Sequence, residues 1–178
     1  MGERLADCRG WDAASGGGLR MGRRIDYLDD PEAPAANSLV PSVNVAVRNE
    51  DGELLLIRRS DNDNWALPGG AMDCGETISQ AGVRETKEES GIDCELTGLV
   101  GIYTNPRHVI LYTSDGEVRQ ECTIVFAARA RGGEPAASSE SSEVRWIDPD
   151  DVDQYPMHTS MRQRVAHVLD ERTTPYIG

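Results

Sequence analysis

The chain has 178 residues, of which 38% are hydrophobic, so we expect one compact domain. The net charge of −13 excludes sequence-independent binding to nucleic-acid polymers or anionic membranes, because such binding requires basic surfaces. The four cysteines form no CxxC pair and have no nearby histidines at zinc-finger spacing, so they suggest neither a zinc-finger site nor a disulfide framework. No apolar run is long enough for a membrane-spanning helix or a signal peptide, and a soluble, cytoplasmic protein is expected.

The N-terminal 40 residues have little apolar periodicity. Glycines and a serine fill residues 15–18, and prolines and acidic residues recur in 29–38, which indicates a flexible or partly ordered lead-in over 1–40. Met21 directly precedes a more regular stretch, so translation starting there is a hypothesis that the intact mass of the native protein would test. We assign one domain to residues 41–172 and a short tail to 173–178.

Globular patterning begins with two apolar runs. Residues 43–47 and 54–58 predict strands, separated by a segment with the Asp-Gly of a tight turn. Residues 61–70 have the composition of a loop. Thr77 and Gln80 form a capping-box pattern and Gly91 a C-terminal stop, which together predict a helix over about 78–90.

The second half of the chain alternates strand and loop signals. Strands are predicted at 96–104, 108–113, 121–130 and 144–147, with a polar loop before the last. Residues 158–171 predict a closing helix with an apolar stripe at Met161, Val165, Val168 and Leu169. The order of elements predicts an α/β fold in which a mixed sheet lies between helices.

The predicted helix at 78–90 concentrates negative charge on one side. Glu85, Glu88 and Glu89 span only about 100° of the helix circumference, whereas Lys87 points away from them. Like charges four residues apart, near the negative end of the helix dipole, are unfavourable. A bound divalent cation would relieve this repulsion, and clustered carboxylates select magnesium, manganese or calcium.

Residues 61–72 begin like the calcium-binding loop of an EF-hand, which is an alternative to a magnesium site. Ala66 stands where an EF-hand loop needs glycine, and Met72 stands where it needs a bidentate glutamate. Residues 61–72 therefore do not match the EF-hand loop, and a calcium site of this kind is rejected. Magnesium completes its shell with water and substrate phosphates, so the glutamates beside a glycine-rich loop indicate a phosphate-containing substrate.

The spacing of these residues resembles the signature box of the Nudix hydrolases, the MutT-like nucleotide pyrophosphohydrolases. The matching positions are Gly70, Glu76, Arg84, Glu85, Glu88, Glu89, Gly91 and Ile92. The stretch WALPGG at 65–70 and the strand LLLIRR also resemble the family, so the likeness covers about residues 43–170. Thr86 and Gly82 depart from the aliphatic residue and the alanine that are common at their positions, without touching a carboxylate.

The resemblance implies an α/β/α sandwich that hydrolyses a nucleoside diphosphate linked to another group, with Mg²⁺ as cofactor and Mn²⁺ as a substitute. It places metal ligands on Glu85, Glu88 and Glu89. We expect Glu89 or Glu88 to take the proton of the attacking water, and Arg84 to orient a box glutamate. Glu76 is expected to brace the loop or to act as an outer ligand.

Further candidates surround this box. The backbone of Gly69 and Gly70 can approach phosphate or metal closely, because neither residue has a side chain. Strand alternation lets only one of Arg58 and Arg59 face the site and contact phosphate. Three more residues have a functional and a structural interpretation: Trp65 stacks on a base or packs, His108 contacts substrate or is structural, and Glu121 is an additional carboxylate or an ordinary strand-end residue.

Two other functions compete with catalysis. A non-catalytic Nudix-like sensor of nucleotide metabolites is disfavoured because every box carboxylate is present, and an RNA-decapping enzyme is disfavoured by the net charge of −13. The sequence leaves ADP-ribose-like compounds, nucleoside triphosphates including oxidised ones, and dinucleoside polyphosphates open as substrates. A homodimer is compatible with the resemblance.

Overall fold

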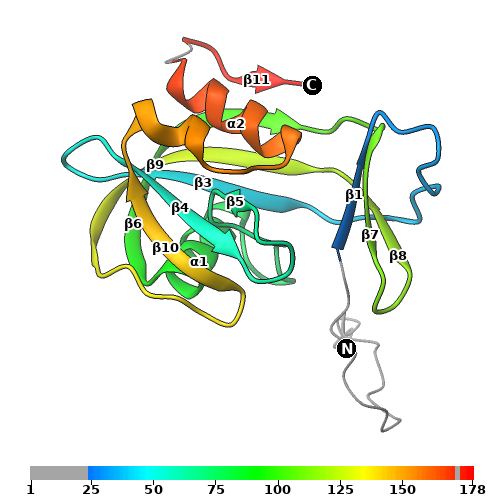
Figure 1. Ribbon diagram of the computed structural model, residues 1–178, viewed down its shortest axis with the longest axis horizontal. Coiled ribbons are helices and arrows are strands. Elements are labelled where there is room, and N and C mark those ends of the chain that lie inside the picture. Colours follow the sequence, from blue (N-terminus) through cyan, green and yellow to red (C-terminus); the bar gives the residue numbers. More distant parts are fainter. Residues whose placement is uncertain (1–23, 171–172) are drawn as a thin grey trace, which may run out of the picture.

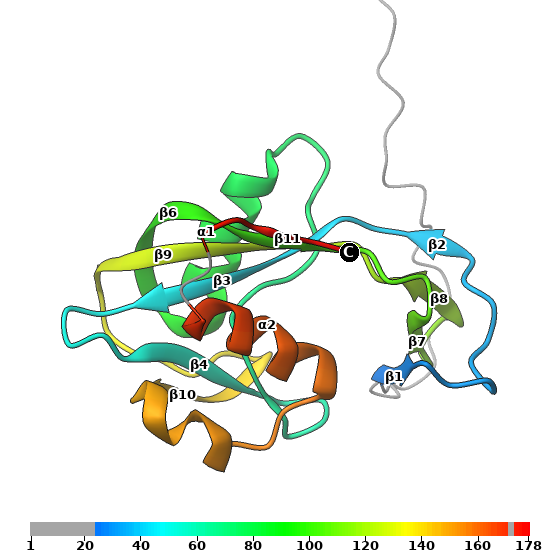
Figure 2. The same cartoon turned by 90° about the horizontal axis from the view of Figure 1, so that it is seen from above.

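The larger of two sheets forms the middle layer of the protein, with one helix on each face (Figures 1 and 2). The computed structural model describes residues 24–170 and 173–178. The sheet is mixed, because β3 pairs in parallel with β9 and β11 in parallel with β6, while the other pairs are antiparallel. Its strand order is β10 (Ser141–Ile147), β4 (Leu54–Arg59), β3 (Ser42–Arg48), β9 (Thr123–Gly133), β6 (Ile92–Tyr103) and β11 (Tyr176–Ile177), with β5 (Trp65–Ala66) paired to β4.

Each face of this sheet has its own apolar core because successive strand residues point to opposite sides. Helix α1 (Ile78–Ser90) covers one face, where the buried residues include Val43, Val45, Leu55, Ala81 and Ile92. Helix α2 (Thr159–Leu169), preceded by the 3₁₀ helix η1 (Pro149–Gln154), covers the other, with Leu54, Leu56, Met161 and Val165. The predicted α/β/α sandwich is therefore confirmed.

Both ends of α1 have the predicted caps. The Thr77 side chain accepts a hydrogen bond from the backbone N–H of Gln80, and the Gln80 side chain accepts one from the Thr77 N–H. Gly91 ends the helix in the left-handed conformation, with φ of 76°. These caps fix the first and last turns of the helix that carries the glutamates.

A second, smaller sheet stands beside the sandwich, as both views show. Its strand order is β1 (Arg24–Leu28), β7 (His108–Tyr112), β8 (Glu117–Gln120) and β2 (Ser38–Leu39). The sequence predicted the strand at 108–113 but no strand at β1, β2 or β8. Each of β1 and β2 pairs with a strand about 80 residues away, for example through Asp26 opposite Ile110, and such pairing leaves no local signal. The proposed start at Met21 lies outside the described residues.

The segment after β5 opens the large sheet between β3 and β4. These two strands pair directly only at Arg48 and Leu54. Farther along, the N–H of Val45 donates to the carbonyl of Pro68 and the N–H of Val43 to that of Gly70, each at 2.9 Å. The glycine-rich loop is therefore held against β3, on the side where α1 lies.

The chain end is paired rather than loose. Strand β11, within the predicted tail, runs parallel to the end of β6, and the N–H of Thr104 donates to the carbonyl of Gly178. In the part of the chain that the structure describes, no helix combines the length and the apolar composition needed to cross a membrane. Cys74, Cys94 and Cys122, the cysteines that the structure describes, form no disulfide with one another.

Candidate active site

Arg84 holds the acidic residues around it in place. Its guanidinium makes two bonds to Glu76, of 3.1 and 2.7 Å, and Nη1 donates to Glu85 at 2.8 Å and to Glu88 at 3.0 Å. Nη2 also donates to the carbonyl of Ala71 in the loop. Hydrogen bonding to Arg84 lowers the pKa of Glu76 to about 2, so this brace remains ionised. Arg84 thus holds three carboxylates and the loop, a larger set than the single box glutamate that the resemblance implied.

Glu85 lies against the backbone of the glycine loop. A side chain at Gly70 would place its Cβ 2.6 Å from the carboxyl carbon of Glu85, so the loop can approach this closely only with glycine. Burial raises the pKa of Glu85, and this effect outweighs the hydrogen bond and the charge of Arg84, which lower it. A positive charge beside Glu85 would therefore stabilise its ionised carboxylate.

Glu89 is the buried member of the cluster, with 3% of its surface exposed. Its Oε2 accepts a hydrogen bond of 2.7 Å from the N–H of Gly69. Burial raises the pKa of Glu89 to about 7, although the bond from Gly69 and the charge of Arg59 act in the opposite direction. An ionised carboxylate at this position is costly in the metal-free protein.

The carboxylates fit a hard divalent cation. Glu88 is the most accessible of them, with 60% of its side chain exposed, and it shares Nη1 of Arg84 with Glu85. All three helix glutamates offer oxygen donors, Glu85 lies against the Gly70 backbone where a Cβ would clash, and Glu85 and Glu89 have raised pKa values. Magnesium and manganese prefer such donors.

A cavity of about 410 Å³ opens in front of these residues. Its lining includes Glu85 and Glu88 from α1, the loop glycines Gly69 and Gly70, and residues of the small sheet. Four arginines besides Arg84 also line it: Arg24, Arg59, Arg119 and Arg164. A polar cavity with carboxylates at one side and guanidiniums around it suits an anionic ligand that carries a cation.

The two arginines at the end of β4 separate as strand alternation predicts. Arg59 lines the cavity and makes two bonds to Asp61, of 3.0 and 2.7 Å. Arg58 points away from it, toward Asp63 and Glu143. Arg59 is therefore the one of the pair that is placed to meet a phosphate.

Trp65 contributes to both the cavity wall and the core. It is 6% exposed, its ring meets that of Tyr155 edge-on at 5.0 Å, and Arg145 lies over its face. These contacts agree with the packing role that the sequence analysis offered for Trp65, although the residue also lines the cavity.

His108 and Glu121 form a buried pair apart from the helix glutamates. His108 is fully buried, and its Nδ1 lies 2.6 Å from Oε2 of Glu121. Glu121 also forms an ion pair with Arg164, whose Nη1 donates to Asn44. Glu121 lines the cavity but is buried among His108, Arg164 and Thr123, so it is not the ordinary exposed strand-end residue that was one of its two interpretations.

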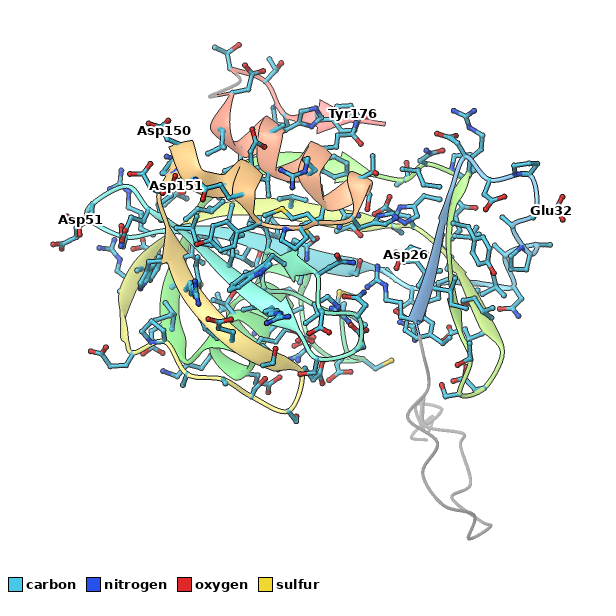
Figure 3. The ribbon with its side chains drawn as sticks, in the orientation of Figure 1. Asp26, Glu32, Asp51, Asp150, Asp151 and Tyr176 are labelled. Carbon is cyan, nitrogen blue, oxygen red and sulfur yellow. The ribbon has the colours of Figure 1, made fainter. Side chains whose placement is uncertain are left out.

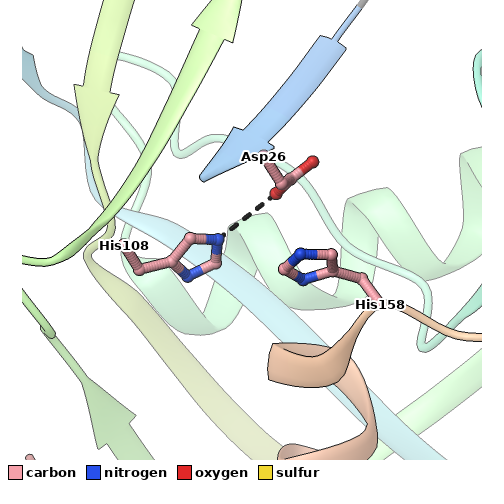
Figure 4. A group of neighbouring side chains, drawn as sticks. All are labelled: Asp26, His108 and His158. Carbon is pink, nitrogen blue, oxygen red and sulfur yellow. Dashed lines mark hydrogen bonds and ion pairs between the residues drawn. The ribbon is translucent and has the colours of Figure 1, made fainter. Parts of the chain in front are cut away.

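Two residues near this pair had no signal in the sequence analysis. Asp26 projects from β1 toward the central sheet, whereas Asp51, Asp150 and Asp151 lie at the far end of the molecule (Figure 3). His158 is the N-cap of α2. Asp26, His108 and His158 offer one ligand atom each, all within 4.8 Å of one another (Figure 4). The available hint was a histidine at the first position of the predicted helix 158–171.

Comparison with known proteins points to a single family. The model described as NUDIX domain matches residues 38–169. A MutT-like protein from Streptomyces ambofaciens is 41% identical over 128 residues, which cover 71% of this chain and 75% of the relative. An ADP-ribose pyrophosphatase from Methanocaldococcus jannaschii is 36% identical over 62% of this chain. A putative 8-oxo-dGTP diphosphatase from Bacillus subtilis is 32% identical over 59% of it. The matches span 63% and 64% of the latter two relatives.

Solved structures agree on the fold. The MutT protein from Methanosarcina mazei Go1 superposes with a TM-score of 0.60 and 25% identity, covering 76% of this chain and 96% of that one. An ADP-ribose pyrophosphatase from Streptococcus suis gives a TM-score of 0.61 at 24% identity, over 79% of this chain and all of that one.

Proposed function

Because the chain belongs to the NUDIX family and is a hydrolase that acts on phosphoanhydride bonds, we propose that it is a Mg²⁺-dependent pyrophosphohydrolase of small nucleotides. Its substrate is a nucleoside diphosphate linked to another group, either an ADP-ribose-like compound or a nucleoside triphosphate. The observation that carries this proposal is the convergence of Glu76, Glu85 and Glu88 on Arg84 at the mouth of the cavity. Mn²⁺ is expected to substitute, and a cytoplasmic location fits such substrates.

The helix carboxylates bind and orient the reacting groups. Glu85, Glu88 and Glu89 would hold the ion, with the Gly70 backbone closing one side. When bound, the ion supplies positive charge that offsets the charge of the diphosphate and activates the attacking water. Arg84 keeps Glu85 and Glu88 in position.

The proton of the attacking water goes to Glu88 in this proposal. Glu88 lines the cavity and is the most exposed of the three glutamates, whereas Glu89 is turned inward to the N–H of Gly69. Arg59, which also lines the cavity, would bind the phosphate that leaves. Attack in line with the departing oxygen requires the water and this phosphate on opposite sides of phosphorus.

The test is product release from a panel of ADP-ribose, sugar nucleotides, dinucleoside polyphosphates, and canonical and oxidised triphosphates, with magnesium or manganese. One class is expected to be cleaved, and Glu88→Gln to lower its turnover by about 100-fold or more. Glu134→Gln is the matched control, because Glu134 is exposed and does not line the cavity. Hydrolysis in ¹⁸O water then identifies the phosphorus that is attacked.

Two results would contradict the proposal. Near-normal turnover in Glu88→Gln and Glu89→Gln would remove the glutamates from the reaction. If the wild type cleaves no compound while several raise its melting temperature, the chain is a sensor of nucleotide metabolites, which was the alternative from the sequence.

A further inference from the structure

Three residues that are far apart in the chain meet at the junction of the two sheets and α2. Asp26 comes from β1, His108 from β7 and His158 from the N-cap of α2, and their ligand atoms lie within 4.8 Å of one another. Figure 4 shows the two imidazoles beside each other and the carboxylate near both. The rings are close to parallel, with centroids 5.5 Å apart.

The surroundings of His108 leave a place for one cation. Its Nδ1 lies 2.6 Å from Oε2 of Glu121 and its Nε2 lies 3.3 Å from Oδ1 of Asp26. A neutral imidazole has one N–H, so it can donate to only one of these carboxylates. If Nδ1 donates to Glu121, the lone pair of Nε2 faces an acceptor, and a proton or a metal ion must lie between them.

His158 is oriented in a similar way. Its Nδ1 lies 2.8 Å from Oγ of Ser160 and, at the N-cap of α2, accepts a hydrogen bond from the backbone N–H of Ser160 at 3.4 Å. Ligation through Nε2 takes the other tautomer, in which Nδ1–H donates to Oγ of Ser160 in place of the cap bond. Carboxylate or hydroxyl partners behind ligand histidines are a regular feature of metal sites, because they set the tautomer and the ring orientation. Here Glu121 and Ser160 supply them.

We propose that Asp26, His108 and His158 bind a divalent transition-metal ion, for which zinc is the probe. Two imidazoles and one carboxylate suit such ions better than magnesium, which prefers oxygen. Ligand atoms on a tetrahedral zinc with bonds of about 2 Å are roughly 3.3 Å apart. The observed 3.3 Å between Nε2 of His108 and Oδ1 of Asp26 fits this spacing, and His158 closes the site with a small movement.

This site is separate from the glutamate cluster, and the proposal does not rest on the hydrolytic function. Asp26 and His158 line the same cavity as Glu85 and Glu88, so a fourth coordination position would open to the cavity. Arg24 donates to both carboxylate oxygens of Asp26, at 2.7 and 2.8 Å, and Arg164 forms an ion pair with Glu121. These guanidiniums oppose the added positive charge and set an upper limit on the affinity.

The experiment is a zinc titration of the chelator-treated full chain in excess magnesium, followed by the ring signals of its three histidines in NMR spectra. One equivalent of zinc is expected to shift the signals of His108 and His158 and to leave that of His167 in place. Cobalt in place of zinc should give the visible absorption of a tetrahedral site with nitrogen ligands.

Variants separate ligation from folding. His158→Asn removes the imidazole but retains a good N-cap residue, and we expect it to weaken zinc binding at least about tenfold while its metal-free melting temperature stays near that of the wild type. His167→Gln, the matched control on the same helix, should bind zinc like the wild type. The proposal is wrong if zinc leaves the two ring signals unchanged, or if His158→Asn binds zinc as tightly as the wild type.

Discussion

Replacing Glu89 by Gln should stabilise the metal-free protein in alkaline solution while abolishing most of its activity. Burial raises the pKa of Glu89 to about 7 from an ordinary value of 4.5. Between these pH values the folded chain keeps a proton that the unfolded chain has released. The free energy of unfolding therefore falls as pH rises through this window.

The magnitude follows from the two pKa values. Each tenfold difference in proton affinity is worth about 1.4 kcal/mol, so the ionisation of Glu89 removes on the order of 2 to 3 kcal/mol between pH 5 and pH 8. Because Glu89 is 3% exposed, solvent screens little of this effect. Glutamine cannot ionise, and its side-chain oxygen can still accept the hydrogen bond from Gly69.

The assay is urea unfolding of the wild type and of Glu89→Gln at pH 5 and pH 8, with a chelator present. The free energy of unfolding of Glu89→Gln relative to the wild type should increase by about 2 to 3 kcal/mol from pH 5 to pH 8. The contributions of other carboxylates, such as the strongly paired Glu76, are the same in both proteins and cancel in this difference. Glu134→Gln should follow the wild type at both pH values. If the curves of wild type and Glu89→Gln run parallel across this range, Glu89 carries no raised pKa and the reasoning fails.

Three further predictions concern the same site. Arg84→Lys keeps the charge but loses the paired bonds to Glu76, so turnover should fall by about 10-fold to 100-fold, measured with the best substrate of the panel. Gly70→Ala should lower activity and magnesium affinity, because its Cβ would meet the carboxyl of Glu85 at 2.6 Å; in Gly98→Ala, where the Cβ meets nothing within 4 Å, both should stay unchanged. Magnesium should raise the melting temperature of the wild type, because the ion binds the strained carboxylates only in the folded state, and a melting temperature unchanged at saturating magnesium would contradict the metal site.

The parts of the site that lie in one helix could be predicted from the sequence. Thr77, Gln80 and Gly91 determine where α1 begins and ends, and helical geometry then places Glu85 and Glu88 on one side. Their arrangement therefore depends on residues within about fifteen positions of one another. The inward turn of Glu89 was not predictable, because it depends on Gly69, twenty positions away in the chain.

Two departures from the family pattern have a packing reason in this chain. A Cβ at Gly82 would lie 3.1 and 3.2 Å from methyl groups of Val45 and Val43, so glycine lets α1 lie close to β3. Thr86 is fully buried, and its hydroxyl donates to the carbonyl of Gly82 at 2.8 Å. The hydroxyl is thus satisfied within the helix, and Thr86 occupies an apolar position without an unpaired polar atom.

The signature box at residues 70–92 does not determine which substrate binds. The box supplies only one wall of the cavity, whereas Asp26, Ile110, Tyr112 and Arg119 of the small sheet line another part of it. That sheet is assembled by pairing between segments about 80 residues apart, so its contribution to the cavity has no local pattern. In the proposed function the glutamates and Arg84 carry out the reaction, whereas the groups that meet the rest of the substrate come from outside the motif. Selectivity should therefore respond to substitutions in β1, β7 and β8 that leave the helix carboxylates untouched.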